Sequence, residues 1–221
     1  MMKNKVVTLG EAVHRIKDGA TIMVGGFLSV GAPVSIIDAI LKKGIKNLTI
    51  IANDTSVPGV GISKLIAAKL VRKVIASHIG TNPETGKQLM AGTLEVQLVP
   101  QGSLAEQIRA AGAGLGGVLT PTGVGTEAAV GKQSIMIGNK EYLIELPLKA
   151  DFAILGGTVS DTFGNTFYNE TTRNFNPFMA TAADTVIVEA DKIVERGELD
   201  AHQVMTPGIF VDYIIRSNSN G

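Results

Sequence analysis

The sequence contains no cysteine. Without that side chain the protein has neither a disulfide framework nor a thiolate nucleophile. It also lacks an excess of charge of either sign, because lysine plus arginine and aspartate plus glutamate number 20 each, and no block of like charge occurs. This balance argues against nucleic acid or an acidic membrane surface as the main partner.

The sequence has no run of apolar residues that would span a membrane. The charge-free stretch at residues 19–37 is divided into shorter elements by glycines and by Pro33. No apolar core of signal-peptide length precedes Glu11. We therefore expect a cytoplasmic protein, with neither a membrane nor nucleic acid among its partners.

Length and composition favour one α/β domain. The chain has 221 residues, of which 45% are hydrophobic and 18% are charged, as expected for a protein with a well-buried core. No internal repeat or linker is evident. We predict a single domain over residues 1–221, with a flexible tail at about 217–221.

One glycine-rich stretch, residues 18–33, organises the rest of the chain. A short apolar run at residues 20–24 has strand character, and the Gly25-Gly26 pair after it lets a ligand approach the backbone closely. Pro33 is placed to begin a helix. A strand, a glycine turn and a helix N-terminus bring backbone N–H donors to the carboxyl edge of a sheet, where open α/β folds bind ligands. The alternative is an incidental glycine turn.

The same stretch resembles a signature of the CoA-transferases, enzymes that move CoA between carboxylic acids. Its pattern is Asp-Gly, two residues, three apolar residues, then Gly-Gly-Phe-x-x-x-Gly-x-Pro, as in α subunits of the acetate/butyrate–acetoacetate type. The resemblance implies an α/β fold with an open, mixed or mostly parallel Rossmann-like sheet flanked by helices. It also implies that the following residues contact CoA: Gly25, Gly26, Phe27, Leu28, Ser29, Val30 and Gly31.

A second segment, residues 94–114, extends the resemblance. Alternating apolar and polar residues predict a strand at its start, and a capping box at residues 103–106 predicts a helix after the turn at Gln101. The family pattern here is Pro-Gln-Gly-x-Leu-x-Glu-x-Ile-Arg-x-x-Gly-x-Gly. It implies that the Gln101 amide stabilises the oxyanion formed when a nucleophile attacks a thioester. The alternative is that this amide caps the helix.

Two loops that follow predicted strands supply further polar candidates. Asn53 follows one strand, and Gly80 and Asn82 follow the next. Because carboxyl strand ends form the ligand side of this architecture, and because similar loops occur in the family, these residues are expected to line the substrate site. An Asx-turn at Asn53 and a plain turn at Asn82 are equally compatible. His78 is a weak candidate for a general base, since no carboxylate partner is evident.

The remaining patterns predict structure and exclude one function. Residues 33–43 predict an amphipathic helix ended by Gly44, and residues 134–145 predict a hairpin. Residues 112–117 match the dinucleotide-binding fingerprint, but a predicted helix precedes them where that motif needs a strand, so we reject nicotinamide binding.

A third segment that resembles the family, Arg-Asn-Phe-Asn, begins at Arg173. A structural ion pair is expected for this arginine, and neutralisation of a carboxylate or phosphate is the alternative. The segment leads into a helix predicted to run through Ala183.

The chain lacks one part of the family's chemistry. The family's nucleophile is a glutamate in a Glu-Asn-Gly-like motif of the β half, and no such motif occurs in this sequence. The resemblance therefore implies an α subunit that works with a separate β subunit in an α2β2-type assembly, on short-chain acyl-CoA and acetate, butyrate or acetoacetate. CoA is then a substrate, and neither a permanently bound cofactor nor a metal is expected.

Two other functions stay open. A sugar-phosphate isomerase of the same general fold would need phosphate-anchoring lysine and serine in its loops, whereas the loops here hold glycine and amides with few cations. A non-catalytic ligand-sensing domain would lack the glutamate without needing a partner.

Overall fold

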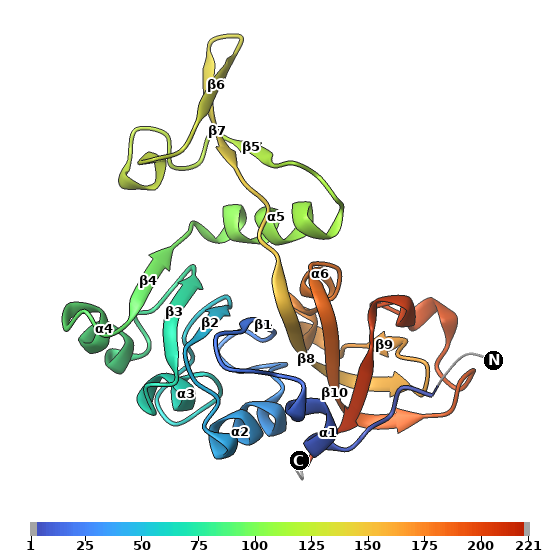
Figure 1. The fold of residues 1–221 in the computed structure, drawn as a ribbon. Coiled ribbons are helices and arrows are strands. Elements are labelled where there is room, and N and C mark those ends of the chain that lie inside the picture. Colours follow the sequence, from blue (N-terminus) through green and yellow to red (C-terminus); the bar gives the residue numbers. More distant parts are fainter. Residues whose placement is uncertain (1–3, 219–221) are drawn as a thin grey trace.

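A mostly parallel sheet forms the centre of the computed structural model, which describes residues 4–218 (Figure 1). The strand order is β11-β10-β8-β1-β2-β3-β4, each neighbouring pair is parallel, and β9 pairs antiparallel with β8. The strands are β1 (Thr21–Val24), β2 (Leu48–Ile51), β3 (Val71–Ala76), β4 (Glu95–Leu98), β8 (Ala150–Asp161), β9 (Thr166–Phe167), β10 (Ala183–Val194) and β11 (Tyr213–Arg216). The predicted fold class is confirmed.

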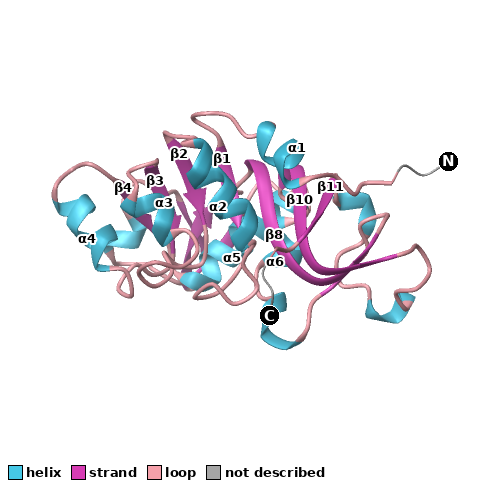
Figure 2. Ribbon diagram, turned by 90° about the horizontal axis from the view of Figure 1, so that it is seen from below, coloured by secondary structure: helices cyan, strands magenta, loops and turns pink. Residues whose placement is uncertain are grey.

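Helices cover both faces of this sheet, so its central strands are apolar on both sides. Neighbouring strand residues alternate between two cores: Ile22 and Ile50 belong to one, and Met23 and Ile51 to the other. The first core includes α1 (Leu9–His14), α2 (Val34–Lys43) and α3 (Ser63–Ala67), and Figure 2 shows α2 and α3 across that face. The second includes α5 (Gln101–Gly112) and α6 (Asn176–Met179). The other helices are α4 (Pro83–Met90), η1 (Glu127–Ala129), η2 (Glu170–Arg173), η3 (Ala201–Gln203) and η4 (Gly208–Phe210).

A small antiparallel sheet stands away from the main body on the side of α5 (Figure 1). It consists of β5 (Val118–Thr120), β6 (Ser134–Ile137) and β7 (Lys140–Glu145) in the order β5-β7-β6, and it contains the predicted hairpin. We call residues 118–145 the arm. Every residue of β6 is exposed. Within residues 4–218, each helix is too short or too polar to cross a membrane.

Helix boundaries show where local patterns were sufficient and where they failed. The helix ended by Gly44 is confirmed, with Gly44 in the left-handed conformation at its C-cap. The predicted capping box of α5 is wrong: the Pro100 carbonyl already accepts the first helical bond from Leu104 N, so the helix begins at Gln101. The Ser103 hydroxyl is buried without a hydrogen-bond partner in the part of the chain that the structure describes.

One further prediction needs correction. The helix expected through Ala183 ends at Met179, because Ala183 pairs with Ala150 at the start of β10 and β8. Of the tail predicted to be flexible, Ser217 is tied to the sheet by its N–H, which donates to the Ala190 carbonyl at 2.8 Å. The Asn218 N–H donates to Ser35 Oγ at 3.1 Å. The rest of that tail lies outside the described residues.

Candidate active site

The glycine-rich segment, residues 25–33, connects the carboxyl end of β1 to α2 and is called the glycine loop here. Phe27 and Val30 exchange backbone hydrogen bonds of 3.1 and 2.9 Å, which closes a two-residue turn. The two central residues, Leu28 and Ser29, have φ values of 47° and 71°. Positive φ at both central positions is the pattern of a type I′ turn and is unfavourable for residues with a Cβ. Such a turn persists only where its surroundings hold it.

One set of contacts to the glycine loop comes from the segment after β2. The Leu28 N–H donates to Asp54 Oδ2 at 2.9 Å, and Ser29 Oγ lies 3.1 Å from Ser56 Oγ. Gly61 leaves room for this contact, since a Cβ there would lie 2.6 Å from Ser29 Oγ. The loop is therefore packed against its neighbour at the same edge of the sheet.

A second set of contacts comes from the Arg-Asn-Phe-Asn segment, about 145 residues further along the chain. The Gly26 N–H donates to Asn174 Oδ1 at 3.0 Å, and Asn174 Nδ2 donates to the Val30 carbonyl at 3.0 Å. Asn176 Nδ2 donates to the Gly31 carbonyl at 3.1 Å. The segment that had only a family resemblance thus braces the glycine loop through its two asparagines.

Sequence reasoning singled out Arg173 in that segment and missed the asparagines beside it. Among residues 4–218 no ion pair involves Arg173, so the expected structural ion pair is wrong. The only available signal for Asn174 and Asn176 was the resemblance itself, because nothing local indicates which backbone groups an amide will contact across the fold.

Glycine is required in the loop because other parts of the chain come very close. A Cβ on Gly25 would overlap Asn176 Oδ1, and a Cβ on Gly31 would overlap the Thr172 carbonyl. A Cβ on Gly156 would lie 2.5 Å from the Gly31 carbonyl oxygen. The glycines therefore permit the packing of the loop against β8 and the Asn174 segment.

The two polar loops predicted from sequence lie together at the same edge. The Ser77 hydroxyl donates to the Asn53 carbonyl at 2.7 Å, and Asn82 Nδ2 donates to the Thr55 carbonyl at 3.0 Å. Both Asn53 and Asn82 are buried. Asn82 also accepts from Glu84 N at 3.2 Å, which makes it the N-cap of α4, where a plain turn had been the alternative.

The Asx-turn considered for Asn53 is formed by its neighbour. Asp54 Oδ1 accepts from Ser56 N at 2.7 Å, and Asn53 Nδ2 donates to Asp54 Oδ2 at 2.8 Å. Gly80 lies under the ring of His78, since a Cβ there would be 2.9 Å from His78 Cε1. Contact of Asn53, Gly80 and Asn82 with substrate stays a prediction.

Gln101 is the first residue of α5 and is exposed. Its amide has no hydrogen-bond partner in residues 4–218, and no side chain caps this helix. The alternative in which the amide caps α5 is therefore wrong, and the group is free to meet a ligand. Because β1 and β4 are three strand spacings apart, roughly 14 Å at about 4.8 Å each, a ligand that reaches both the glycine loop and Gln101 must be extended.

The exposed face of the glycine loop is apolar. Phe27, Leu28 and Val30 expose about two fifths or more of their surface (43, 40 and 47%). A hollow of about 500 Å³ lies beside them, lined by Phe27, Val30, Thr171 and Asn174. The edge of the sheet thus combines one free amide with an apolar hollow.

Comparison with known proteins identifies the family. The chain matches the coenzyme A transferase family over residues 6–217. It belongs to that family. This coenzyme A transferase chain is 53% identical over 215 residues to the acetoacetyl-CoA:acetate/butyrate CoA transferase alpha subunit of Clostridium acetobutylicum, covering 97% of this chain and 99% of that protein. It is 52% identical over 219 residues to the acetate CoA-transferase subunit alpha of Escherichia coli K12, covering 99% and 100%.

Solved structures agree with this assignment. The coenzyme A transferase chain superimposes with a TM-score of 0.87 and 25% identity on an acyl-CoA transferase of Escherichia coli O157:H7 in a thioester complex with CoA, covering 99% of this chain but 48% of that one. It therefore spans about half of that longer polypeptide. Glutaconate coenzyme A-transferase of Acidaminococcus fermentans shares the fold, with a TM-score of 0.81 and 22% identity over 96% of this chain and 75% of that one. The predicted family and fold are confirmed.

Proposed function

We propose that this chain is the α subunit of a CoA-transferase that moves CoA between a short-chain acyl-CoA and a carboxylic acid such as acetate, butyrate or acetoacetate. The single observation that carries the proposal is identity above 50% to two α subunits over essentially their whole length. The partner is a β subunit, and an α2β2 assembly is the simplest arrangement of the two chains. CoA enters as a substrate, and we propose no permanently bound cofactor. The cytoplasmic location stays a prediction.

The proposed reaction needs a carboxylate nucleophile, which we assign to a glutamate of the β subunit. Its carboxylate attacks the acyl-CoA carbonyl, the C–S bond breaks, and an acyl–glutamyl anhydride and CoA thiolate form. The thiolate then attacks the glutamyl carbonyl, which releases the first carboxylic acid and leaves a glutamyl–CoA thioester. The second acid reverses both steps. Because one thioester replaces another, the reaction needs neither ATP nor a redox cofactor.

This chain is proposed to supply the surroundings of that chemistry. The glycine loop, including Gly25, Gly26 and Gly31, contacts CoA, and its exposed apolar side chains suit a long, partly apolar ligand. The free Gln101 amide N–H donates to the oxyanion at the attacked carbonyl. A contact of this type lowers the activation free energy by roughly 2.7–4 kcal/mol.

The composition of the loops supports CoA over a sugar phosphate. Residues 25–33, 53–59 and 77–82 contain no lysine and no arginine. A site built to hold a small phosphate sugar needs such cations or a dense array of hydroxyls. A ligand-sensing domain without a partner is disfavoured because the matched α subunits are parts of transferases.

The test is reconstitution with a β subunit that carries a Glu-Asn-Gly motif. Neither chain alone should transfer CoA from acetoacetyl-CoA to acetate, whereas the mixture should. Borohydride reduction of the enzyme–CoA thioester should modify a glutamate of the β subunit. Transfer by the purified α chain alone, or labelling of one of its own glutamates, would overturn the proposal.

A further inference from the structure

We propose that Asp54 is a positioning residue that holds the glycine loop in the conformation that contacts CoA. The inference rests on the proposed function of that loop. Asp54 is 5% exposed and lies directly after β2 and Asn53, where its carboxylate accepts from the Leu28 N–H of the turn. It acts through the backbone it holds.

Within residues 4–218, the hydrogen bonds of the Asp54 carboxylate all come from N–H donors. Oδ2 accepts from Leu28 N at 2.9 Å and from Asn53 Nδ2 at 2.8 Å, and Oδ1 accepts from Ser56 N at 2.7 Å. Among residues 4–218 no ion pair involves Asp54. If the Leu28 N–H moved away, the buried carboxylate would lose one of the hydrogen bonds that stabilise its charge. The carboxylate and the turn therefore hold each other in place.

The turn needs such an anchor because of its own backbone. Leu28 and Ser29 have positive φ, a conformation that residues with a Cβ rarely adopt. Asp54 reaches both of them, directly at Leu28 N and indirectly through Ser56, whose hydroxyl contacts Ser29 Oγ. Without the carboxylate, nothing on the β2 side of the turn accepts the Leu28 N–H, and the turn relaxes toward negative φ.

This arrangement predicts a specific kinetic signature. Relaxation of the turn displaces the loop groups that contact CoA, but not Gln101 or the nucleophile of the partner. Replacement of Asp54 therefore raises KM for acyl-CoA while KM for the carboxylate acceptor and kcat change little. A purely structural role would instead lower the active fraction and leave both KM values unchanged.

The primary experiment compares Asp54→Ala with Asp161→Ala in the α/β mixture, assayed with acetoacetyl-CoA and acetate. Asp161 is a matched control, because it is also buried (2% exposed) and accepts from Phe163 N, Asn165 N and Asn165 Nδ2, but in the turn between β8 and β9. Asp54→Ala should raise KM for acetoacetyl-CoA by about tenfold, the factor that corresponds to one hydrogen bond to a charged group. Asp161→Ala should lower thermal stability without changing that KM. An equal KM in the two variants overturns the proposal.

A rescue variant separates positioning from folding. Glycine adopts positive φ without strain, so Leu28→Gly makes the turn less dependent on its anchor. Adding Asp54→Ala to Leu28→Gly should therefore raise KM for acetoacetyl-CoA by less than Asp54→Ala does in the wild-type loop. Equal effects in the two backgrounds contradict the proposal. If Asp54→Ala does not fold, Asp54→Asn replaces it, because either orientation of the amide sets an NH₂ against one of the same N–H donors.

Hydrogen exchange of the full chain tests the anchor without any assay of CoA transfer. The peptide that contains Leu28 should exchange faster in Asp54→Ala than in the wild type, and in Asp161→Ala it should not. Unchanged exchange overturns the proposal. A wild-type α/β mixture without CoA transfer would instead refute the proposed function and, with it, the CoA part of this inference, while faster exchange would still establish the anchor.

Discussion

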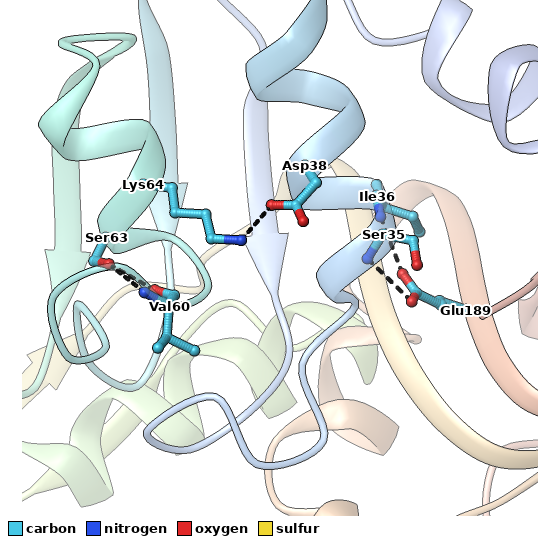
Figure 3. Close-up of polar contacts among 7 residues, drawn as sticks. All are labelled: Ser35, Ile36, Asp38, Val60, Ser63, Lys64 and Glu189. Atoms are coloured by element: carbon cyan, nitrogen blue, oxygen red, sulfur yellow. Dashed lines mark hydrogen bonds and ion pairs between the residues drawn. The ribbon is translucent and has the colours of Figure 1, made fainter. Parts of the chain in front are cut away.

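The Glu189 carboxylate caps a helix that lies 153 residues earlier in the chain (Figure 3). Its two oxygens accept from Ser35 N and Ile36 N in the first turn of α2, each at 3.0 Å. The residue at the N-cap position, Pro33, has no side chain that can do this. Since α2 follows the glycine loop directly, Glu189 ties the end of that loop to β10, and a negative charge at a helix N-terminus is favourable.

Removal of this cap should destabilise the protein. Glu189→Ala leaves the buried Ile36 N–H and the partly buried Ser35 N–H without this acceptor, which we expect to lower the free energy of unfolding by about 1–3 kcal/mol in a urea titration. Glu198→Ala is the control, because Glu198 accepts from Glu195 N in an exposed turn and its loss should change stability by roughly 0.5 kcal/mol or less. Equal losses in the two variants would show that the Glu189 cap contributes no more to stability than an exposed surface contact does.

The free amide of Gln101 should matter for turnover more than for binding. Gln101→Ala in the α/β mixture should lower kcat by about 10²–10³-fold, because the donor to the oxyanion acts mainly in the transition state, while KM for acyl-CoA changes little. Gln97→Ala is the control on the neighbouring strand β4, where an exposed amide is also present. An unchanged kcat in Gln101→Ala would remove this residue from the mechanism.

Two glycines with similar φ separate backbone strain from steric overlap. Gly44 (φ 66°) has open space around its Cβ position, so Gly44→Ala should cost only the strain of the left-handed conformation, about 1–2 kcal/mol. At Gly31 (φ 72°) an added Cβ would also overlap the Thr172 carbonyl. Gly31→Ala should therefore lower the free energy of unfolding by about 1–3 kcal/mol more than Gly44→Ala does. Urea titration measures both. Similar losses in the two variants would mean that the Thr172 segment moves away from the added Cβ without loss of stability.

The buried Glu145 carboxylate forms an ion pair within the arm and accepts the hydrogen bond that ties the arm to α5. Glu145 is 1% exposed and accepts from Lys132 Nζ and Gln107 Nε2, each at 2.6 Å. Lys132→Ala leaves this carboxylate buried without its cation, which we expect to cost roughly 3–5 kcal/mol. Local opening should appear as faster hydrogen exchange in peptides of residues 118–145.

The pair of Lys73 and Glu95, 2.8 Å apart, is the control for the arm, because the Glu95 side chain is 65% exposed. Lys73→Ala should cost about 1 kcal/mol or less, since solvent screens that pair. Unchanged hydrogen exchange of the arm in Lys132→Ala would show that the ion pair within the arm does not limit its opening.

Tyr168 should make stability fall in alkaline solution. Burial raises the pKa of this phenol, and its hydroxyl lies 2.8 Å from Thr206 Oγ1. Below about pH 10 the phenol is neutral in both the folded and the unfolded state, whereas above that value only the unfolded state releases its proton readily. The stabilisation is therefore fully present below about pH 10 and is lost as the pH rises further.

Comparison of the wild type with Tyr168→Phe isolates this effect. The variant starts lower by roughly 1 kcal/mol because it loses one hydrogen bond, but its stability should fall less between about pH 9 and about pH 11. The measurement is urea unfolding at both values. Parallel losses in the two proteins would assign the alkaline effect to other groups.

Local patterns in the sequence determined much of this protein. Short apolar runs predicted the central strands, Gly44 marked the end of α2, and two short runs joined at Gly138-Asn139 indicated the hairpin of the arm. The glycine signature and the Gln101 motif pointed to the coenzyme A transferase family. These features are readable because strand burial, helix ends and tight turns depend on residues that are neighbours in the chain.

Only the tertiary structure decided what holds the site together. Asp54, Asn174 and Glu189 each contact backbone groups between 26 and 154 residues away, and no local pattern specifies which N–H or carbonyl group they meet. The early start of α5 left Gln101 free because the Pro100 carbonyl took over the first helical bond. Side chains that satisfy distant backbone groups are chosen by the packing of the whole fold, so they become visible only when that packing is known.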